Sequence, residues 1–269
     1  MQRLGNKNFK VGVCCMQGRR ESMEDAHVAV VDMENHKGWA LFAVFDGHDG
    51  SETSVFCAEN IYKKLDSCKE FTSEEIIEKF LELDEDLGNR NSGSTCSLVL
   101  VDTNTQTDKG TRIIVANLGD SRSLVGRYDS GDVRALTTDH KPELPSEASR
   151  IEAAGGVVYR NRVDSSLAVS RAFGDKPYKA NAKLAKDKQK VICVPEVTES
   201  YIAKNEFLYI CCDGIFETYT NETAIQFCTS LMKDTQDTAA VLSNLLTSTL
   251  KGGSRDNMTA MLIELADGT

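Results

Sequence analysis

The chain has 269 residues, 41% hydrophobic and 27% charged, which is typical of a globular protein. Its 31 basic and 41 acidic residues give a formal net charge of −10. This charge argues against a nucleic-acid backbone or an anionic membrane as a general partner. The longest apolar runs, such as residues 41–45, are too short to cross a bilayer, and no basic-then-apolar signal segment opens the chain.

Hydrophobic periodicity divides the chain into short strands and amphipathic helices. Thr72 and Glu75 have the spacing of a capping box, and Gly252 with Gly253 marks the end of the last helix. In chain order we expect strands at 9–16, 26–33 and 39–45, a helix at 51–65, a second helix after residue 72, strands at 97–102, 112–117 and 122–127, a short helix at 146–154, a strand at 206–212, helices at 221–232 and 237–250, and a final strand at 258–265.

The order of these elements indicates the fold class. Strands and helices come in runs and not in regular alternation, which favours an α+β protein with largely antiparallel sheets and helices packed outside. No repeat or linker interrupts the pattern. We therefore expect one domain over residues 1–269.

Carboxylates recur beside the ends of predicted strands. Such groups are costly near a core unless they are paired or bound to a cation. An all-oxygen set would suit Mg²⁺ or Mn²⁺, whereas a single Asp-Gly pair after a strand is often only a turn. The pattern alone leaves both interpretations open. The residues are Asp46 with Gly47, Gly119 with Asp120, Asp213 with Gly214, Asp256, and Glu24 with Asp25.

Several short motifs resemble those of the metal-dependent protein Ser/Thr phosphatases of type 2C. The first two are R-E-S-M-E-D at residues 20–25 and F-D-G-H-D-G at 45–50. Each motif alone is a weak signal, but their order matches that family and they cover nearly the whole chain. The others are S-T at 94–95, A-N-L-G-D-S-R at 116–122, D-H-K-P at 139–142, L-A-V-S-R-A-F-G-D at 167–175, C-D-G-I-F at 212–216 and S-R-D-N-M at 254–258.

The resemblance implies a four-layer α-β-β-α sandwich of two mostly antiparallel sheets flanked by helices. It also implies two Mn²⁺ or Mg²⁺ ions at one edge, between the sheets. By position, Asp46 would bridge the two ions and the Gly47 carbonyl oxygen would bind one of them. Asp213 and Asp256 would complete the coordination of the other ion.

Three further carboxylates have more indirect implied roles. Glu24 and Asp25 would act through metal-bound water. Adjacent residues of a strand point to opposite sides, so we do not expect both to touch one ion. Asp120, with Asp213, matches the position that holds a third, weaker ion in some members of the family.

The implied activity is hydrolysis of phosphoserine and phosphothreonine in phosphoprotein substrates, by direct attack of a hydroxide that bridges the two metals. Arg20 would hold the phosphate oxygens, a task that suits a planar guanidinium. His48 would protonate the departing serine or threonine oxygen. The family resemblance also suggests a monomer.

Other polar residues of the motifs have less distinctive contexts. For Asp139, His140 and Asp175 we expect structural roles. Five lysines at positions 179, 183, 186, 188 and 190 fall where the family has a variable flap beside the active site. They form either a solvated loop or a surface that favours acidic phosphosubstrates, and the first interpretation is the simpler.

Two other functions compete with a metal-dependent enzyme. The spacing from Cys14 to Arg20 fits the C-x₅-R pattern of cysteine-dependent tyrosine phosphatases, but Glu24 and Asp25 would oppose a thiolate. A pseudophosphatase that only binds partners is opposed by the presence of every metal-position carboxylate and of Arg20. The 9 cysteines form no C-x-x-C pair. They predict buried free thiols in a reducing compartment, the cytoplasm or the nucleus.

Overall fold

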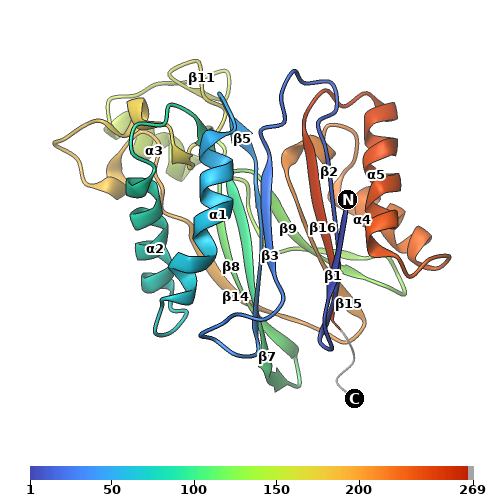
Figure 1. The fold of residues 1–269 in the computed structure, drawn as a ribbon. Helices are drawn as coiled ribbons and strands as arrows, with labels where there is room; N and C mark the ends of the chain where they lie inside the picture. Colours follow the sequence, from blue (N-terminus) through green and yellow to red (C-terminus); the bar gives the residue numbers. More distant parts are fainter. Residues whose placement is uncertain (266–269) are drawn as a thin grey trace.

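Two antiparallel β-sheets pack face to face between two layers of helices in the computed structural model, which describes residues 1–265 (Figure 1). The first sheet has the order β1-β2-β16-β15-β9-β10 and the second β14-β8-β7-β4-β3. The first comprises β1 (Gln2–Gly5), β2 (Phe9–Met16), β16 (Met258–Leu265), β15 (Glu206–Cys211), β9 (Arg122–Arg127) and β10 (Val133–Ala135). The second comprises β14 (Glu196–Ile202), β8 (Gly110–Leu118), β7 (Cys96–Thr107), β4 (Trp39–Phe45) and β3 (Ala26–Val30).

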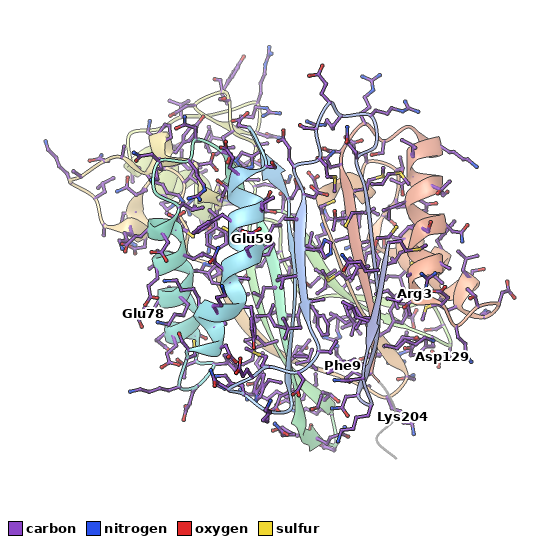
Figure 2. All side chains as sticks on the ribbon, viewed as in Figure 1. Arg3, Phe9, Glu59, Glu78, Asp129 and Lys204 are labelled. Atoms are coloured by element: carbon purple, nitrogen blue, oxygen red, sulfur yellow. The ribbon has the colours of Figure 1, made fainter. Side chains whose placement is uncertain are left out.

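Helices cover the outer face of each sheet (Figure 1). Helices α1 (Glu52–Asp66) and α2 (Ser73–Asp86) pack on the second sheet, and α4 (Asn221–Met232) and α5 (Thr238–Gly252) pack on the first. Charged residues such as Glu59 and Glu78 lie on the exposed faces of α1 and α2, while side chains fill the space between the sheets (Figure 2). These layers are the predicted α-β-β-α sandwich.

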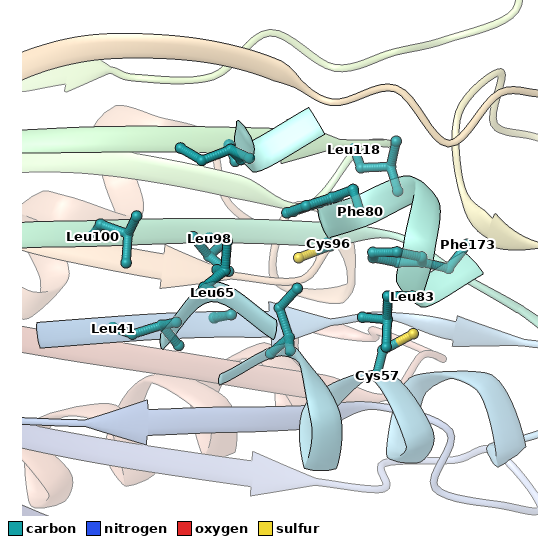
Figure 3. Close-up of a cluster of buried hydrophobic side chains, with 14 of the residues drawn as sticks. Leu41, Cys57, Leu65, Phe80, Leu83, Cys96, Leu98, Leu100, Leu118 and Phe173 are labelled. Carbon is teal, nitrogen blue, oxygen red and sulfur yellow. The ribbon is translucent and has the colours of Figure 1, made fainter. Parts of the chain in front are cut away.

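Strand β4 contributes side chains to two hydrophobic cores. Its residues alternate between the two faces of the sheet, as the period of a strand requires. Leu41 and Phe45 pack with α1 and α2, whereas Phe42 and Val44 pack against the first sheet. Both faces are therefore buried, which is why residues 41–45 form a continuous apolar run. Figure 3 shows Leu41 with Leu98 and Leu100 in the outer of these two cores.

A smaller group of elements lies at one end of the sandwich, near β5 (Figure 1). It includes α3 (Pro145–Ala153), the hairpin of β11 (Val158–Tyr159) and β12 (Arg162–Val163), and two 3₁₀ turns, η1 (Lys176–Lys179) and η2 (Lys186–Lys188). A three-stranded sheet joins this group to the core in the order β13-β6-β5. Its strands are β13 (Phe173–Gly174), β6 (Gly93–Ser94) and β5 (Gly47–His48). No helix within residues 1–265 is long and apolar enough to cross a membrane.

The sequence pattern placed most elements correctly and missed mainly edge strands. Strands β1 and β14 lie at sheet edges with many exposed residues, so they lack an apolar pattern. The capping box predicted at α2 is only half formed. The Thr72 hydroxyl accepts a hydrogen bond from the Glu75 amide, but the Glu75 carboxylate accepts from the amides of Lys69 and Glu70 instead.

Candidate metal centre and active site

Acidic residues from both sheets line one cleft of about 660 Å³ at the end of the sandwich. Asp46 follows β4 and Asp120 follows β8 in the second sheet. Asp213 lies two positions after the end of β15 and is the first residue of the 3₁₀ turn η3 (Asp213–Ile215). Asp256 precedes β16 in the first sheet. Glu24 also lines the cleft. The strand-end carboxylates that the sequence singled out, apart from Asp25, therefore line the same cleft.

Close packing beside Gly214 brings two of these carboxylates together. A Cβ atom added at Gly214 would lie 2.0 Å from the Asn257 carbonyl oxygen and 3.1 Å from the Asp256 Cβ. Any side chain there would push η3 away from the segment that carries Asp256. The glycine that follows Asp213 thus permits the approach of two strand ends from the first sheet.

Burial and mutual repulsion disfavour the ionised form of this carboxylate cluster. Burial raises the pKa of Asp213 to about 7, and the charge of Asp120 adds to the rise. Burial also raises the pKa of Asp46 well above its usual range, and Asp213 and Asp25 raise it further. Divalent cations would neutralise this cluster and favour its ionised form.

The surroundings of Asp25 also favour a bound cation. Burial raises the pKa of Asp25 to about 6, and neither of its carboxylate oxygens has a hydrogen-bond partner within residues 1–265. Asp25, Asp46 and Cys212 each offer a ligand atom, and these atoms lie within 4.8 Å of one another. Buried carboxylates without partners are rare in proteins unless an ion or water satisfies them. The residues present therefore fit a metal centre.

The sequence placed Glu24 and Asp25 on a strand with opposite orientations, whereas in the structure both precede β3 and have different surroundings. Glu24 lines the cleft, where its carboxylate accepts hydrogen bonds from the Ser22 hydroxyl at 2.7 Å and the Gly50 amide at 3.2 Å. Asp25 does not line the cleft and is buried beside Asp46 and Cys212. The proximity of the Cys212 sulfur to this carboxylate pair was not expected from the sequence.

Arg20 lies at the cleft beside a predicted metal ligand. Its Nη2 atom donates a hydrogen bond to Asp256 Oδ2 at 2.8 Å. The neighbouring Arg19 does not line the cleft, and its Nη2 reaches the Leu250 carbonyl oxygen at 3.4 Å. Of the two arginines, only Arg20 lines the cleft, and its role as the phosphate-binding residue stays a prediction.

Asn257 supports the loop that carries Arg20, a role that the sequence did not suggest. Its amide nitrogen donates to the carbonyl oxygens of Gln17 at 2.8 Å and Ser22 at 2.9 Å. Its amide oxygen accepts from the Glu24 amide at 2.8 Å. One buried side chain therefore fixes both ends of the loop against the start of β16.

His48 lines the cleft, and one of its ring nitrogens contacts the carboxylate of Asp175. Its Nε2 atom lies 2.8 Å from Asp175 Oδ2. Burial lowers the pKa of His48, but the hydrogen bond and charge of Asp175 more than offset this, and the net pKa is raised. Asp175, for which the sequence suggested only a structural role, thus contacts a candidate catalytic residue. Only the fold reveals this, since 127 positions separate the two.

Asp120 is buried and paired with a lysine. Lys141 Nζ donates to Asp120 Oδ2 in a short ion pair. Burial lowers the pKa of Lys141, but Asp120 raises it more, so the net pKa is raised and the amine stays charged. The lysine of the D-H-K-P motif therefore pairs with a carboxylate that lines the cleft, while His140 is buried and accepts a hydrogen bond from the Gly119 amide.

The alternative cysteine mechanism finds no support at Cys14. This thiol is 5% exposed in β2, where it packs with residues of α5, and burial raises its pKa. Cys14 is also absent from the cleft lining. A thiolate nucleophile needs a lowered pKa and access to substrate.

The lysines of the flap are largely engaged in ion pairs. Lys186 contacts Glu85, Lys188 contacts Asp187 at 2.9 Å, and Lys190 contacts Asp164 at 2.7 Å. None of the five predicted lysines lines the cleft. The arrangement favours a solvated loop over a substrate-selecting surface.

Comparison with known proteins assigns the chain to a family. A sequence profile described as Protein phosphatase 2C matches residues 9–258. The chain belongs to the protein phosphatase 2C family. It is 38% identical to a probable protein phosphatase 2C of Caenorhabditis elegans, with 98% of this chain and 76% of the relative covered. It is 37% identical to human protein phosphatase 1A, with 97% and 72% covered.

Solved structures agree with this assignment to the protein phosphatase 2C family. A crystal structure of a phosphatase from Toxoplasma gondii superposes with a TM-score of 0.89 at 28% identity, covering 98% of this chain and 94% of that one. The chain is thus a protein Ser/Thr phosphatase of the 2C type, and the family implies a binuclear Mg²⁺ or Mn²⁺ centre and phosphoprotein substrates. When bound, such ions supply an activated water and neutralise phosphate charge.

Proposed function

We propose that the cleft is the active site for hydrolysis of phosphoserine and phosphothreonine. The two ions would be held by Asp46, the Gly47 carbonyl, Asp213 and Asp256. Glu24 and Asp25 would act through metal-bound water. The observation that carries this proposal is the convergence of these acids, whose mutual repulsion and burial raise the pKa values of Asp46 and Asp213. A cluster of this kind needs divalent cations to stay ionised at neutral pH.

The remaining cleft residues take roles that their chemistry suits. Arg20 would bind the phosphate oxygens through its planar guanidinium. His48 would give a proton to the departing oxygen, since its pKa is raised by Asp175 and it is charged in more of the molecules near neutral pH. Its Nε2 contacts Asp175, which leaves Nδ1 as the nitrogen that would face the substrate.

Several broader features belong to the same proposal. Asp120 and Asp213 would hold a third, weaker ion, for which Lys141 would have to move aside. Residues 1–269 would form one catalytic domain that acts as a monomer, because the large exposed hydrophobic residues described, such as Val55 and Tyr159, are few. The free cysteines suit the cytoplasm or the nucleus.

The test is hydrolysis of a phosphothreonine peptide with Mn²⁺, with Mg²⁺ and with EDTA, by the natural chain and by Asp213→Asn. We expect turnover with either ion, none in EDTA, and a loss of at least about 100-fold in the variant. Calorimetric titration with Mn²⁺ provides a second readout and should detect weaker binding to Asp213→Asn. Turnover that persists in EDTA would contradict the proposed site.

A further inference from the structure

One carboxylate of α2 holds two distant parts of the chain next to the active site. Asp84 Oδ1 accepts a hydrogen bond from the Gly174 amide at 2.7 Å. Lys179 Nζ lies 2.9 Å from both oxygens of the same carboxylate and also donates to the Ala172 carbonyl oxygen at 2.8 Å. The side chains of Asp84 and Lys179 are only 17% and 13% exposed. Asp84 thus fixes the backbone immediately before Asp175.

That backbone has a conformation that needs support. Gly174 has φ +72° and Asp175 has φ +52°, so two consecutive residues are left-handed. A non-glycine residue in this region costs about 1–2 kcal/mol, somewhat less for aspartate. The Asp175 amide makes only a long hydrogen bond, 3.4 Å, to the Ser92 carbonyl oxygen. Surrounding contacts must therefore hold this segment in place.

Helix α2 also contacts the residue before Gly174. Phe173 stacks on Phe80 of α2 with ring centroids 5.1 Å apart, and Figure 3 shows the two rings beside Leu83. The helix thus binds the segment twice, by aromatic packing at Phe173 and by a charged acceptor at Gly174. Hydrophobic packing alone could place Phe173, whereas the Gly174 amide is held by its hydrogen bond to the Asp84 carboxylate.

The segment that contains Gly174 and Asp175 is linked to His48, the candidate catalytic histidine. Gly174 pairs with Gly93 in the three-stranded sheet, and Gly93 pairs with His48. Asp175 Oδ2 lies 2.8 Å from His48 Nε2. We propose that Asp84, paired with Lys179, is a positioning residue that fixes Asp175 and, through it, the orientation of His48. This proposal rests on the role of His48 given above.

The arrangement has a specific chemical consequence. In the reaction, water attacks phosphorus and releases one proton to solvent, and the bond from phosphorus to the serine or threonine oxygen breaks. That oxygen takes a proton from His48, which then regains a proton from solvent. A general acid of this kind contributes about 10²–10⁴-fold to the rate, and only when correctly aligned. A 4-nitrophenyl leaving group is stable as an anion and needs little protonation. Misplacing His48 should therefore slow the peptide reaction more than the 4-nitrophenyl phosphate reaction.

The test compares Asp84→Ala with Asp86→Ala in the Mn²⁺-loaded enzyme. Asp86 lies on the same helix and pairs with Lys64 at 2.8 Å, away from Gly174, so it is a matched control. For Asp84→Ala we expect kcat on a phosphothreonine peptide to fall about 10- to 100-fold. The ratio of that kcat to the kcat on 4-nitrophenyl phosphate should fall about 10-fold or more. Asp86→Ala should leave both values within about 2-fold of the natural chain.

A second variant and a second readout keep the test decisive. Lys179→Met removes the ammonium group but keeps the Asp84 carboxylate that accepts from the Gly174 amide. The ratio of kcat on the peptide to kcat on 4-nitrophenyl phosphate should fall for this variant too. Lys179→Met therefore replaces Asp84→Ala in the test if Asp84→Ala does not fold. Amide exchange at Gly174 should accelerate in Asp84→Ala. An equal loss on both substrates, or no loss on the peptide, would overturn the positioning role. Failure of the natural chain to hydrolyse either substrate would instead contradict the proposed function.

Discussion

The Arg20 guanidinium donates a hydrogen bond to Asp256, so the candidate phosphate-binding group and a candidate metal ligand are in direct contact at 2.8 Å. Arg20 is 57% exposed and Asp256 is 23% exposed, which leaves the other guanidinium nitrogens free to meet a substrate. The contact places a positive charge beside the acidic cluster of the cleft, which Arg162 also lines. If Arg20 binds phosphate and Asp256 binds metal, as proposed, this contact would couple the two.

Replacing Arg20 should weaken substrate recognition. We expect Arg20→Ala to lower kcat/KM for a phosphothreonine peptide about 10- to 100-fold, since charge-assisted hydrogen bonds contribute about 1.5–3 kcal/mol. Arg20→Lys should recover only part of this loss because an ammonium cannot bind two oxygens in a plane. Steady-state kinetics measure both values. Arg19→Ala is the control, and a loss as large as that of Arg20→Ala would contradict the assignment.

Removing the Asn257 side chain should loosen the loop that carries Arg20. Asn257→Ala loses hydrogen bonds to Gln17, Ser22 and Glu24, and we expect a cost of about 1–3 kcal/mol in the free energy of unfolding. KM should rise as well. Urea denaturation and kinetics together test this prediction. Asn244→Ala, which removes one exposed hydrogen bond to Ala240, should change neither quantity.

Stability of the metal-free protein should fall as pH rises from 6.5 to 8. The folded-state pKa of Asp213 is about 7 and that of Asp46 is raised well above its usual range, so the folded state holds more protons than the unfolded chain in this window. Unfolding then becomes easier as protons are removed. His140, with its pKa lowered by burial to about 4, acts in the opposite direction but only below about pH 6.5.

Thermal unfolding in EDTA at pH 6.5 and pH 8 checks this pH dependence. We expect a lower Tm at pH 8, and a smaller decrease for Asp213→Asn, which removes one titrating group. Saturating Mn²⁺ should raise the Tm most at pH 8, where the carboxylates are ionised. A Tm in EDTA that rises with pH across this window would contradict the electrostatic description of the cleft.

Catalysis should not depend on Cys14. The thiol is buried in β2 and its pKa is raised, so Cys14→Ala should retain metal-dependent turnover within about 3-fold, apart from any loss of stability. Alkylation of the natural chain with iodoacetamide offers an independent check. Loss of all activity in a folded Cys14→Ala sample would restore the cysteine mechanism.

Much of the fold could be predicted because its signals are local. The apolar run that ends at Asp46 is buried on both faces, and Gly253 has the left-handed backbone that ends α5. Strand β14 escaped prediction because its exposed edge position leaves no apolar period. The sequence also did not predict that the Glu75 carboxylate accepts hydrogen bonds from the amides of Lys69 and Glu70, because these two residues precede the helix in a turn.

The candidate site was partly readable from the same sequence. Three of the carboxylates, Asp46, Asp120 and Asp213, stand beside glycines near strand ends, and the order of the motifs added the implied roles of all the candidate residues. Contacts between segments far apart in the chain were not readable. The link from Asp84 to Gly174, the pairing of Asp175 with His48, and the placement of Cys212 beside Asp25 depend on how the sheets and α2 pack.

Anomalous diffraction at the manganese edge, from crystals grown with Mn²⁺, tests the proposed metal centre most directly. We expect two strong peaks in the cleft, one beside the Gly47 carbonyl and one beside Asp213 and Asp256, with Asp46 between them. Crystals of Asp46→Asn should lose or weaken both peaks. Peaks confined to Asp25 and Cys212, or no bound Mn²⁺ in the cleft, would contradict the proposed metal centre.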